Sequence, residues 1–218
     1  MNTTSGRAPD PRPLRTRAAI YAAAREMGES RTEVTVNALA RRAGVSRAAF
    51  YSHFSSLDDV VSGIISDRLA QARERYEQEA DQDTPVPVQV HREVLRMSRY
   101  VAAHRSFIAS VLTWRISHRA YATLVDEFAE QCEYAYAQLP DGVPSHVDPV
   151  VTARFHAGGV AEIHTDWLRA SERAGTSAGT DCETAVECGD MLAERVLRAL
   201  PTWLTGIEPG APIPAVEL

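Results

Sequence analysis

Residues 46–53 place side chains that could contact nucleic acid within one short stretch. Arg47 carries a planar guanidinium whose donors match guanine O6 and N7. The methyl groups of Ala48 and Ala49 could contact the methyl group of thymine. The polar residues further along suit phosphates or groove edges: Tyr51, Ser52 and His53. If a helix holds this stretch at the surface, the chemistry predicts contact with duplex DNA.

Two short predicted helices, joined by a turn at Gly44, would position these side chains. Thr35 and Ser46 are good N-cap residues and each begins one helix. Gly44 can adopt the left-handed conformation that ends the first helix. Ala40 is small enough for the helices to touch, and Val45 fills the core from the turn. This pattern predicts a helix-turn-helix, whose helix N-termini also present N–H groups to phosphates.

The second of these helices would be about 12 Å long at 1.5 Å per residue, close to the width of the major groove. Its expected inward residues are Ala49 or Phe50, together with Phe54. On the A-x-x-x-G-V motif alone, an ordinary helical hairpin is an equal alternative. Arg47 and His53 would then be solvated residues without a role in recognition.

The helical pattern extends through the chain, and no alternating run is long enough for a sheet. The sequence therefore predicts an all-α fold with a three-helix domain at 15–56 and a larger helical domain at 57–205, joined by a long helix. Residues 1–14 are expected to be a flexible basic arm, and 206–218 a flexible tail. Later helices are predicted at about 88–104, 106–116, 120–139, 148–170 and 182–204.

Charge is distributed unevenly along the chain, although the net charge is −6. Residues 1–57 hold nine Arg against four acidic residues, a balance of +5, whereas residues 58–218 carry 14 Arg against 25 acidic residues, a balance of −11. The basic part is the part predicted to meet a polyanion. Its first arginines either follow the minor groove or only solubilise the arm: Arg7, Arg12, Arg15 and Arg17.

Apolar runs are only a few residues long, so we expect no membrane span or secretory signal, and a cytoplasmic protein. The three cysteines, Cys132, Cys182 and Cys188, form no C-x-x-C pair. Reduced thiols are therefore expected in place of a disulfide or zinc site.

Catalytic motifs are absent from the sequence, including G-x-S-x-G, the P-loop, H-E-x-x-H and G-x-G-x-x-G. We therefore expect no enzyme activity and no cofactor. His156 and His164 are eight residues apart, too far to bind one metal ion as an i, i+4 pair does, so no metal site is expected. Gly158 and Gly159 lie within a helical pattern and indicate a close approach by another helix.

The run TVNALARRAGVSRAAFYSHFSSLDDVV, residues 35–61, closely resembles the DNA-binding signature of the tetracycline-repressor (TetR) family. The matching residues are Thr35, Leu39, Ala40, Ala43, Gly44, Val45, Ser46, Tyr51, His53 and Phe54. The resemblance implies a homodimer that binds a near-palindromic operator and represses until a small molecule binds the larger domain. It also implies DNA contacts from Thr35, Arg47, Ala48, Ala49, Tyr51 and His53. Leu57 departs from the lysine common in the family and weakens the case for a phosphate contact.

The same resemblance extends to FHAGGVAEIHTDWL, which is similar to the family's penultimate helix. It implies a dimer interface formed by Phe155, Gly159, Ile163, Trp167, Gly189, Leu192 and Val196. It implies a cavity for a hydrophobic or aromatic effector lined by Trp114, His118, Tyr121, Phe128, Phe155 and His156. The alternative is a DNA-binding architectural or scaffold protein whose larger domain binds another protein.

Overall fold

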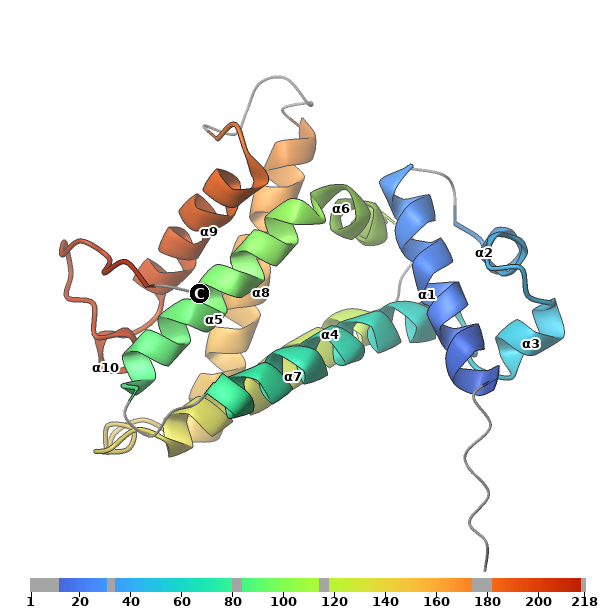
Figure 1. Cartoon of the computed structure of the whole chain (residues 1–218). Helices are drawn as coiled ribbons and strands as arrows, with labels where there is room; N and C mark the ends of the chain where they lie inside the picture. The colour runs from blue at the N-terminus through green and yellow to red at the C-terminus, as the bar shows by residue number, and fades with distance from the viewer. Residues whose placement is uncertain (1–11, 31–33, 80–83, 114–117, 174–181, 217–218) are drawn as a thin grey trace, which may run out of the picture.

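The computed structural model describes residues 12–30, 34–79, 84–113, 118–173 and 182–216. Every regular element in these ranges is a helix (Figure 1). The helices are α1 (Arg12–Glu29), α2 (Val36–Arg42), α3 (Arg47–Tyr51), α4 (Leu57–Glu79), α5 (Val86–Ala103), α6 (Arg105–Thr113), α7 (His118–Ala137), α8 (Pro149–Arg173), α9 (Ala185–Ala199) and α10 (Thr202–Thr205). The all-α prediction is confirmed, with a small N-terminal helix-turn-helix domain and a larger helical domain.

The helix ends differ from the sequence-based boundaries by up to five residues, and prolines explain two of the differences. Helix α1 begins at Arg12, three residues early, because a proline in the first turn is compatible with a helix. The last long helix ends at Ala199, since Pro201 follows, and α10 forms a separate turn. Ile207, the second residue of the predicted tail 206–218, is buried, so the tail packs against the domain at this point.

The N-terminal domain has a closely packed core to which four helices contribute fully buried side chains. Ile20 of α1, Leu39 of α2, Phe50 of α3 and Val60 of α4 are completely inaccessible to solvent. Phe107 of α6 joins the same cluster from the larger domain. The core of the small domain therefore includes side chains from both parts of the molecule.

The larger domain is built from long helices that pack side by side. Helix α5 packs along α9, α7 packs along α8, and α4 runs beside α7 from the small domain into the larger one (Figure 1). None of the helices in the described ranges combines the length and the apolar character needed to cross a membrane.

Two glycines mark places where a neighbouring helix packs directly against the backbone of the glycine. A Cβ atom on Gly28 of α1 would lie 2.5 Å from Phe107 Cδ2 of α6. A Cβ atom on Gly189 of α9 would lie 2.5 Å from the Arg99 Cα of α5. Both distances are too short for any other residue, so these glycines set the spacing of α1 from α6 and of α5 from α9.

Candidate nucleic-acid interface and ligand cavity

The turn between α2 and α3 has the geometry that its sequence predicts. Thr35 Oγ1 accepts a hydrogen bond from the Ala38 N–H at 3.2 Å, and Ser46 Oγ accepts one from the Ala49 N–H at 3.0 Å. Gly44 has a φ of 68°, and no atom lies within 4 Å of the place where its Cβ would be. Glycine is therefore required there by backbone conformation alone.

Helix α3 presents a polar face to solvent while Phe50 anchors its other side in the core. Arg47, Ala48 and Tyr51 are exposed, and the Tyr51 side chain is 50% accessible. Within the described part of the chain, Arg47 has no carboxylate partner, so its guanidinium is available to an outside acceptor. The cap residues of α2 and α3 are also exposed: Thr35, Ser46 and Ser52.

The two remaining predicted contacts are less accessible. Ala49 and His53 are half-buried, and the His53 ring lies 6.5 Å from that of Phe54. The Ser52 hydroxyl donates to the Ala49 carbonyl at 2.8 Å, which leaves its oxygen as an acceptor. The predicted set therefore divides into an exposed group led by Arg47 and a partly covered group at the helix end.

Helix α1 supports this pair of helices through polar contacts that the sequence did not reveal. Arg17 donates to the Tyr21 hydroxyl at 2.6 Å, and its guanidinium lies 5.4 Å from the Phe54 ring centroid. Arg42 donates from Nε to Glu26 at 2.8 Å, joining α2 to α1. Arg17 therefore belongs to the packed domain, whereas Arg7 and the rest of the predicted arm before residue 12 lie outside the described residues.

Two further residues bear on phosphate contacts near α2 and α3. Leu57, at the start of α4, packs against the small domain's core, where lysine would be poorly placed. Arg41 is exposed in the last turn of α2 and has no ion-pair partner among the described residues. Sequence reasoning missed Arg41 as a candidate phosphate contact, although the adjacent arginine pair was a possible signal.

The larger domain contains a cavity of about 270 Å³ between α4, α5, α6, α7 and α8. Its walls are mainly apolar, as is usual for sites that bind small molecules. The apolar lining includes Ile64, Leu69, Val101, Ile108, Leu124 and Leu168.

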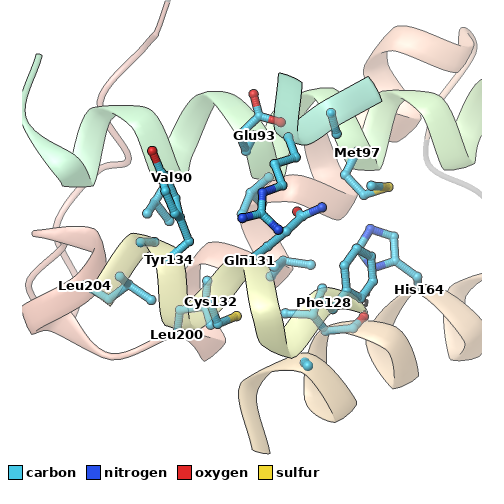
Figure 2. Close-up of a pocket in the computed structure, with 17 residues that line it drawn as sticks. Val90, Glu93, Met97, Phe128, Gln131, Cys132, Tyr134, His164, Leu200 and Leu204 are labelled. Carbon is cyan, nitrogen blue, oxygen red and sulfur yellow. Dashed lines mark hydrogen bonds between the residues drawn. The ribbon is translucent and has the colours of Figure 1, made fainter. Parts of the chain in front are cut away.

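A smaller cavity of about 130 Å³ lies next to it. Met97, Phe128 and His164 line both cavities. Figure 2 shows these three at one end of the smaller cavity and Tyr134, Leu200 and Leu204 toward the other. A shift of the shared side chains would join the two spaces into one.

His164 is a buried polar group in this shared wall. Its Nδ1 lies 2.7 Å from the Val160 carbonyl oxygen, and its Nε2 lies 3.2 Å from the Ser98 hydroxyl. The carbonyl can only accept, so Nδ1 carries the proton and Nε2 accepts from Ser98. Burial lowers the pKa of His164 below its usual value, which keeps the ring neutral.

Cys132 lines the smaller cavity as a thiol of low reactivity. Burial raises the pKa of Cys132 to about 11, so the thiol stays protonated at neutral pH. The reduced state expected for the cysteines is wrong for the other two, because Cys182 and Cys188 form a disulfide. Cys182 precedes α9 and Cys188 lies at its start, so the helix brings their Cα atoms to 5.2 Å.

The predicted ligand residues are only partly gathered at these cavities. Tyr121 and Phe128 line the larger cavity. Trp114 lies outside the described residues, and at His118 only the helix backbone is described. The assignment of Phe155 to the ligand cavity is wrong, because its side chain is 76% exposed on the outer face of α8.

The assignment of His156 to the ligand cavity is also wrong, since His156 belongs to a buried polar cluster that lines neither cavity. Its Nδ1 lies 2.5 Å from the Tyr136 hydroxyl, and its ring lies 6.0 Å from that of Trp203. Burial lowers the pKa of His156 and raises that of Tyr136, so both groups stay neutral. This cluster joins α7, α8 and α10.

Four residues of the predicted dimer interface are instead inside the single chain. Trp167, Leu192 and Val196 are buried in its core, and Gly189 lies against α5. Such residues offer no surface to a second copy, so their assignment is corrected. Phe155 and Gly159 are exposed on α8, and Ile163 is half-buried. Val150, Val151 and Val186 add exposed apolar surface on α8 and α9.

Metal ligands do not gather in the described part of the chain, where no three His, Cys, Asp or Glu side chains come together. The two histidines weighed as ligands, His156 and His164, are each engaged in hydrogen bonds, and Glu162 on the same helix pairs with Arg169 at 3.0 Å.

Comparisons with known proteins agree with this geometry. Residues 19–64 match the family model described as bacterial regulatory proteins, tetR family. No curated protein matches the sequence.

Several solved structures share the fold. A Thermus thermophilus FadR in complex with lauroyl-CoA, a TetR-family repressor, is 20% identical with a TM-score of 0.59, over 91% of this chain and 99% of that one. A Bacillus subtilis FadR in complex with stearoyl-CoA is 17% identical with a TM-score of 0.60, over 88% and 99%. The TetR-family repressor QsdR of R. erythropolis is 14% identical with a TM-score of 0.56, over 91% and 97%. At these identities the likeness concerns the fold.

Proposed function

The chain, by its N-terminal domain, belongs to the TetR family of transcriptional regulators, and we propose that it is a cytoplasmic, dimeric repressor released from DNA by a lipophilic effector. Helix α3 would enter the major groove, with Arg47 as the principal base contact and Ala48 beside it. Tyr51 and Arg41 would contact the backbone. The exposure of this face supports that assignment, as does the lack of a carboxylate partner for Arg47 among the residues that the structure describes.

One observation carries the proposal: the wall of the cavity and the core of the small domain share side chains. Ile64 of α4 and Phe107 of α6 belong to both. A ligand that moves either side chain therefore acts directly on the packing beneath α3. The contact of Gly28 with Phe107 passes the same displacement to α1.

The effector is proposed to have a long apolar part. The two cavities are lined mainly by aliphatic and aromatic side chains, and Met97 and Phe128 can repack between them. The FadR structures in complex with lauroyl-CoA and stearoyl-CoA support an acyl chain as the first candidate. An aromatic effector of similar volume is also compatible with this lining.

The dimer is proposed to form through the outer face of α8 and the start of α9. Val151 and Phe155 are 64% and 76% exposed on α8, which is unusual for large apolar side chains of a monomer. Gly158 and Gly159 on the same helix have open space around them, so a second copy of α8 could approach closely. A two-fold dimer would present the two α3 helices to successive major grooves, about 34 Å apart or a multiple of that distance.

Selection of bound duplexes from a random pool by the full-length protein would test this proposal. We expect an enriched near-palindrome, and a mass in solution of two chains. Lauroyl-CoA, dodecanoate and dodecanol would then be titrated into the complex while release is followed by fluorescence anisotropy. Arg47→Ala should weaken binding by about 1–3 kcal/mol at one base position.

The control is Arg198→Ala, an exposed arginine of α9 that pairs with Glu194 at 2.8 Å. It should leave operator affinity unchanged. A monomer that binds no duplex at low salt would contradict the proposal. Operator binding that no lipophile weakens would instead favour an architectural or scaffold protein.

A further inference from the structure

The larger cavity has a single formally charged side chain among its described lining residues, the guanidinium of Arg68 on α4. The neighbouring base in the wall, His164, is neutral because it is buried. An isolated charge in an apolar wall is unfavourable unless a partner of opposite charge accompanies it. The pairing of Arg68 therefore decides what the cavity can accept.

The Arg68 side chain is held in place but not satisfied. Its guanidinium lies 4.3 Å from the centroid of the Tyr100 ring, a cation–π contact that fixes one face. Its Nε is buried and has no hydrogen-bond partner within the described part of the chain. Buried polar groups are hydrogen-bonded in the great majority of cases, so an unpartnered Nε in a cavity wall indicates a missing acceptor.

The carboxylate whose charge acts on Arg68 is hydrogen-bonded to another arginine. Glu93 of α5 acts on Arg68 through its charge, but it accepts a hydrogen bond from Arg96 at 2.7 Å. Two turns along α4, Arg75 also has a buried Nε without a partner. Burial lowers the pKa of Arg68, and the positive charge of Arg75 lowers it further. A negative charge at this edge of the cavity would offset both effects.

We propose that the effector is an amphipathic anion whose carboxylate or phosphate binds Arg68 and whose apolar body fills the cavity. The inference rests on the function proposed above. An arginine bound through Nε and one terminal nitrogen forms two parallel hydrogen bonds with a carboxylate or phosphate. The stacked Tyr100 ring fixes the guanidinium plane beforehand, so little freedom is lost on binding.

The cavity volume sets the size of the apolar body. An engineered cavity of about 150 Å³ holds benzene, so about 270 Å³ accommodates roughly 11 carbon atoms. Movement of Met97 and Phe128 would add the smaller cavity. A twelve-carbon chain is therefore a suitable probe, because it tests the head group without demanding a large rearrangement.

The test compares four twelve-carbon probes on the full-length protein by calorimetry, each below its micelle threshold: dodecanoate, dodecyl phosphate, lauroyl-CoA and neutral dodecanol. We expect at least one anionic probe to bind about tenfold or more tightly than dodecanol. Arg68→Met, which keeps the length and loses the charge, should abolish that advantage while leaving dodecanol affinity within about twofold. Arg68→Lys should retain part of the advantage of the anionic probes, because lysine keeps the positive charge but cannot donate two parallel hydrogen bonds.

Arg198→Met is the matched control and should preserve every affinity. Dependence on Arg68 for dodecanoate identifies a carboxylate, and dependence for lauroyl-CoA or dodecyl phosphate alone identifies a phosphate. Equal binding of anionic and neutral probes, or an equal loss for all of them in Arg68→Met, would overturn this inference and leave the proposed function standing. No binding by any probe would overturn this inference and the acyl chain as first candidate, while the operator selection tests the proposed function separately.

Discussion

The small domain has a closely packed core, whereas the larger domain contains cavities. The two helix-turn-helix elements of the small domain are short, since α2 has seven residues and α3 has five. The central side chains of this domain, including Leu39 and Phe50, are fully buried. The larger domain is built from helices of up to 25 residues and encloses cavities of about 270 and 130 Å³.

The difference follows from how each kind of helix is stabilised. A helix of five residues is unstable alone and depends on the packing of its buried face. A long helix satisfies most of its own backbone groups, so it tolerates unfilled space along one side. We infer that the small domain keeps one shape, while the walls of the larger domain can adjust around a ligand.

Removing one ring from each region tests this contrast most strongly. Phe50→Ala should lower the free energy of unfolding by about 3–5 kcal/mol, because the ring is fully buried and its neighbours cannot collapse. Phe128→Ala should cost clearly less, since that ring already borders both cavities. Denaturant unfolding of both variants measures the difference. Equal losses would break the comparison.

Arg47→Ala separates recognition from stability in the small domain. The side chain is exposed, so the free energy of unfolding should change by less than about 0.5 kcal/mol. The loss of about 1–3 kcal/mol should appear only in DNA binding, at one base position. Competition between operators that each differ at one position measures it. A uniform loss at every position would instead assign Arg47 to a phosphate.

Two glycines with open space around them isolate the effect of backbone conformation. Gly44→Ala should destabilise by about 1–2 kcal/mol, because its φ of 68° is unfavourable for a side chain. Gly158→Ala, inside α8, should stabilise the chain by about 0.5–1 kcal/mol at a dilution where it is monomeric and the proposed α8 interface is not formed, since alanine is the better helix former. Thermal unfolding of the two variants should therefore give shifts of opposite sign.

The smallest expected effect concerns the buried ring in the cavity wall. The pKa of His164 is lowered in the folded protein, so the unfolded chain takes up the proton first as pH falls through about 6.5. Stability is therefore fully present above that pH and is lost below it. Between pH 6.5 and 5.5 this ring contributes a loss of at most about 1 kcal/mol.

Burial also lowers the pKa of His91 and His156, so the contribution of His164 must be isolated. We expect His164→Gln to show a shallower fall in stability than the wild type over that interval, measured by urea unfolding. Identical slopes would mean that His164 is protonated as readily in the folded state as in the unfolded chain.

The small domain could be predicted in detail because its signals are local. Thr35 and Ser46 act as caps through bonds to residues three positions away, and Gly44 acts through its own φ. Phe50 is buried because one face of a short helix must meet a core. None of these features depends on how distant helices pack.

The interface and ligand residues of α8 were only partly predictable, because a step of four residues does not stay on one helix face. Each step advances about 40° beyond a full turn, since a turn has 3.6 residues. From Phe155 to Trp167 three steps add about 120°. Phe155 therefore faces solvent, while Trp167 is buried.

The cavities themselves had no sequence signal. Their volume depends on how α4 to α8 are spaced, and their linings combine residues more than 100 positions apart, such as Ile64 and Leu168. In the sequence, nothing distinguishes Arg68 from the other charged residues of the long helix α4. Only its packing under Tyr100 and its unpartnered Nε distinguish it.

The contact at Gly189 has a consequence for how the larger domain can deform. Helices α5 and α9 touch backbone to backbone there, and Arg99 fastens them with two hydrogen bonds to Asp190, at 2.6 and 3.0 Å. We infer that α5 and α9 move together as one unit when a ligand enters the domain. Widening of the larger cavity would then fall to its other walls, α4, α6, α7 and α8, and of these α4 and α6 also contribute side chains to the core beneath the DNA-binding helices.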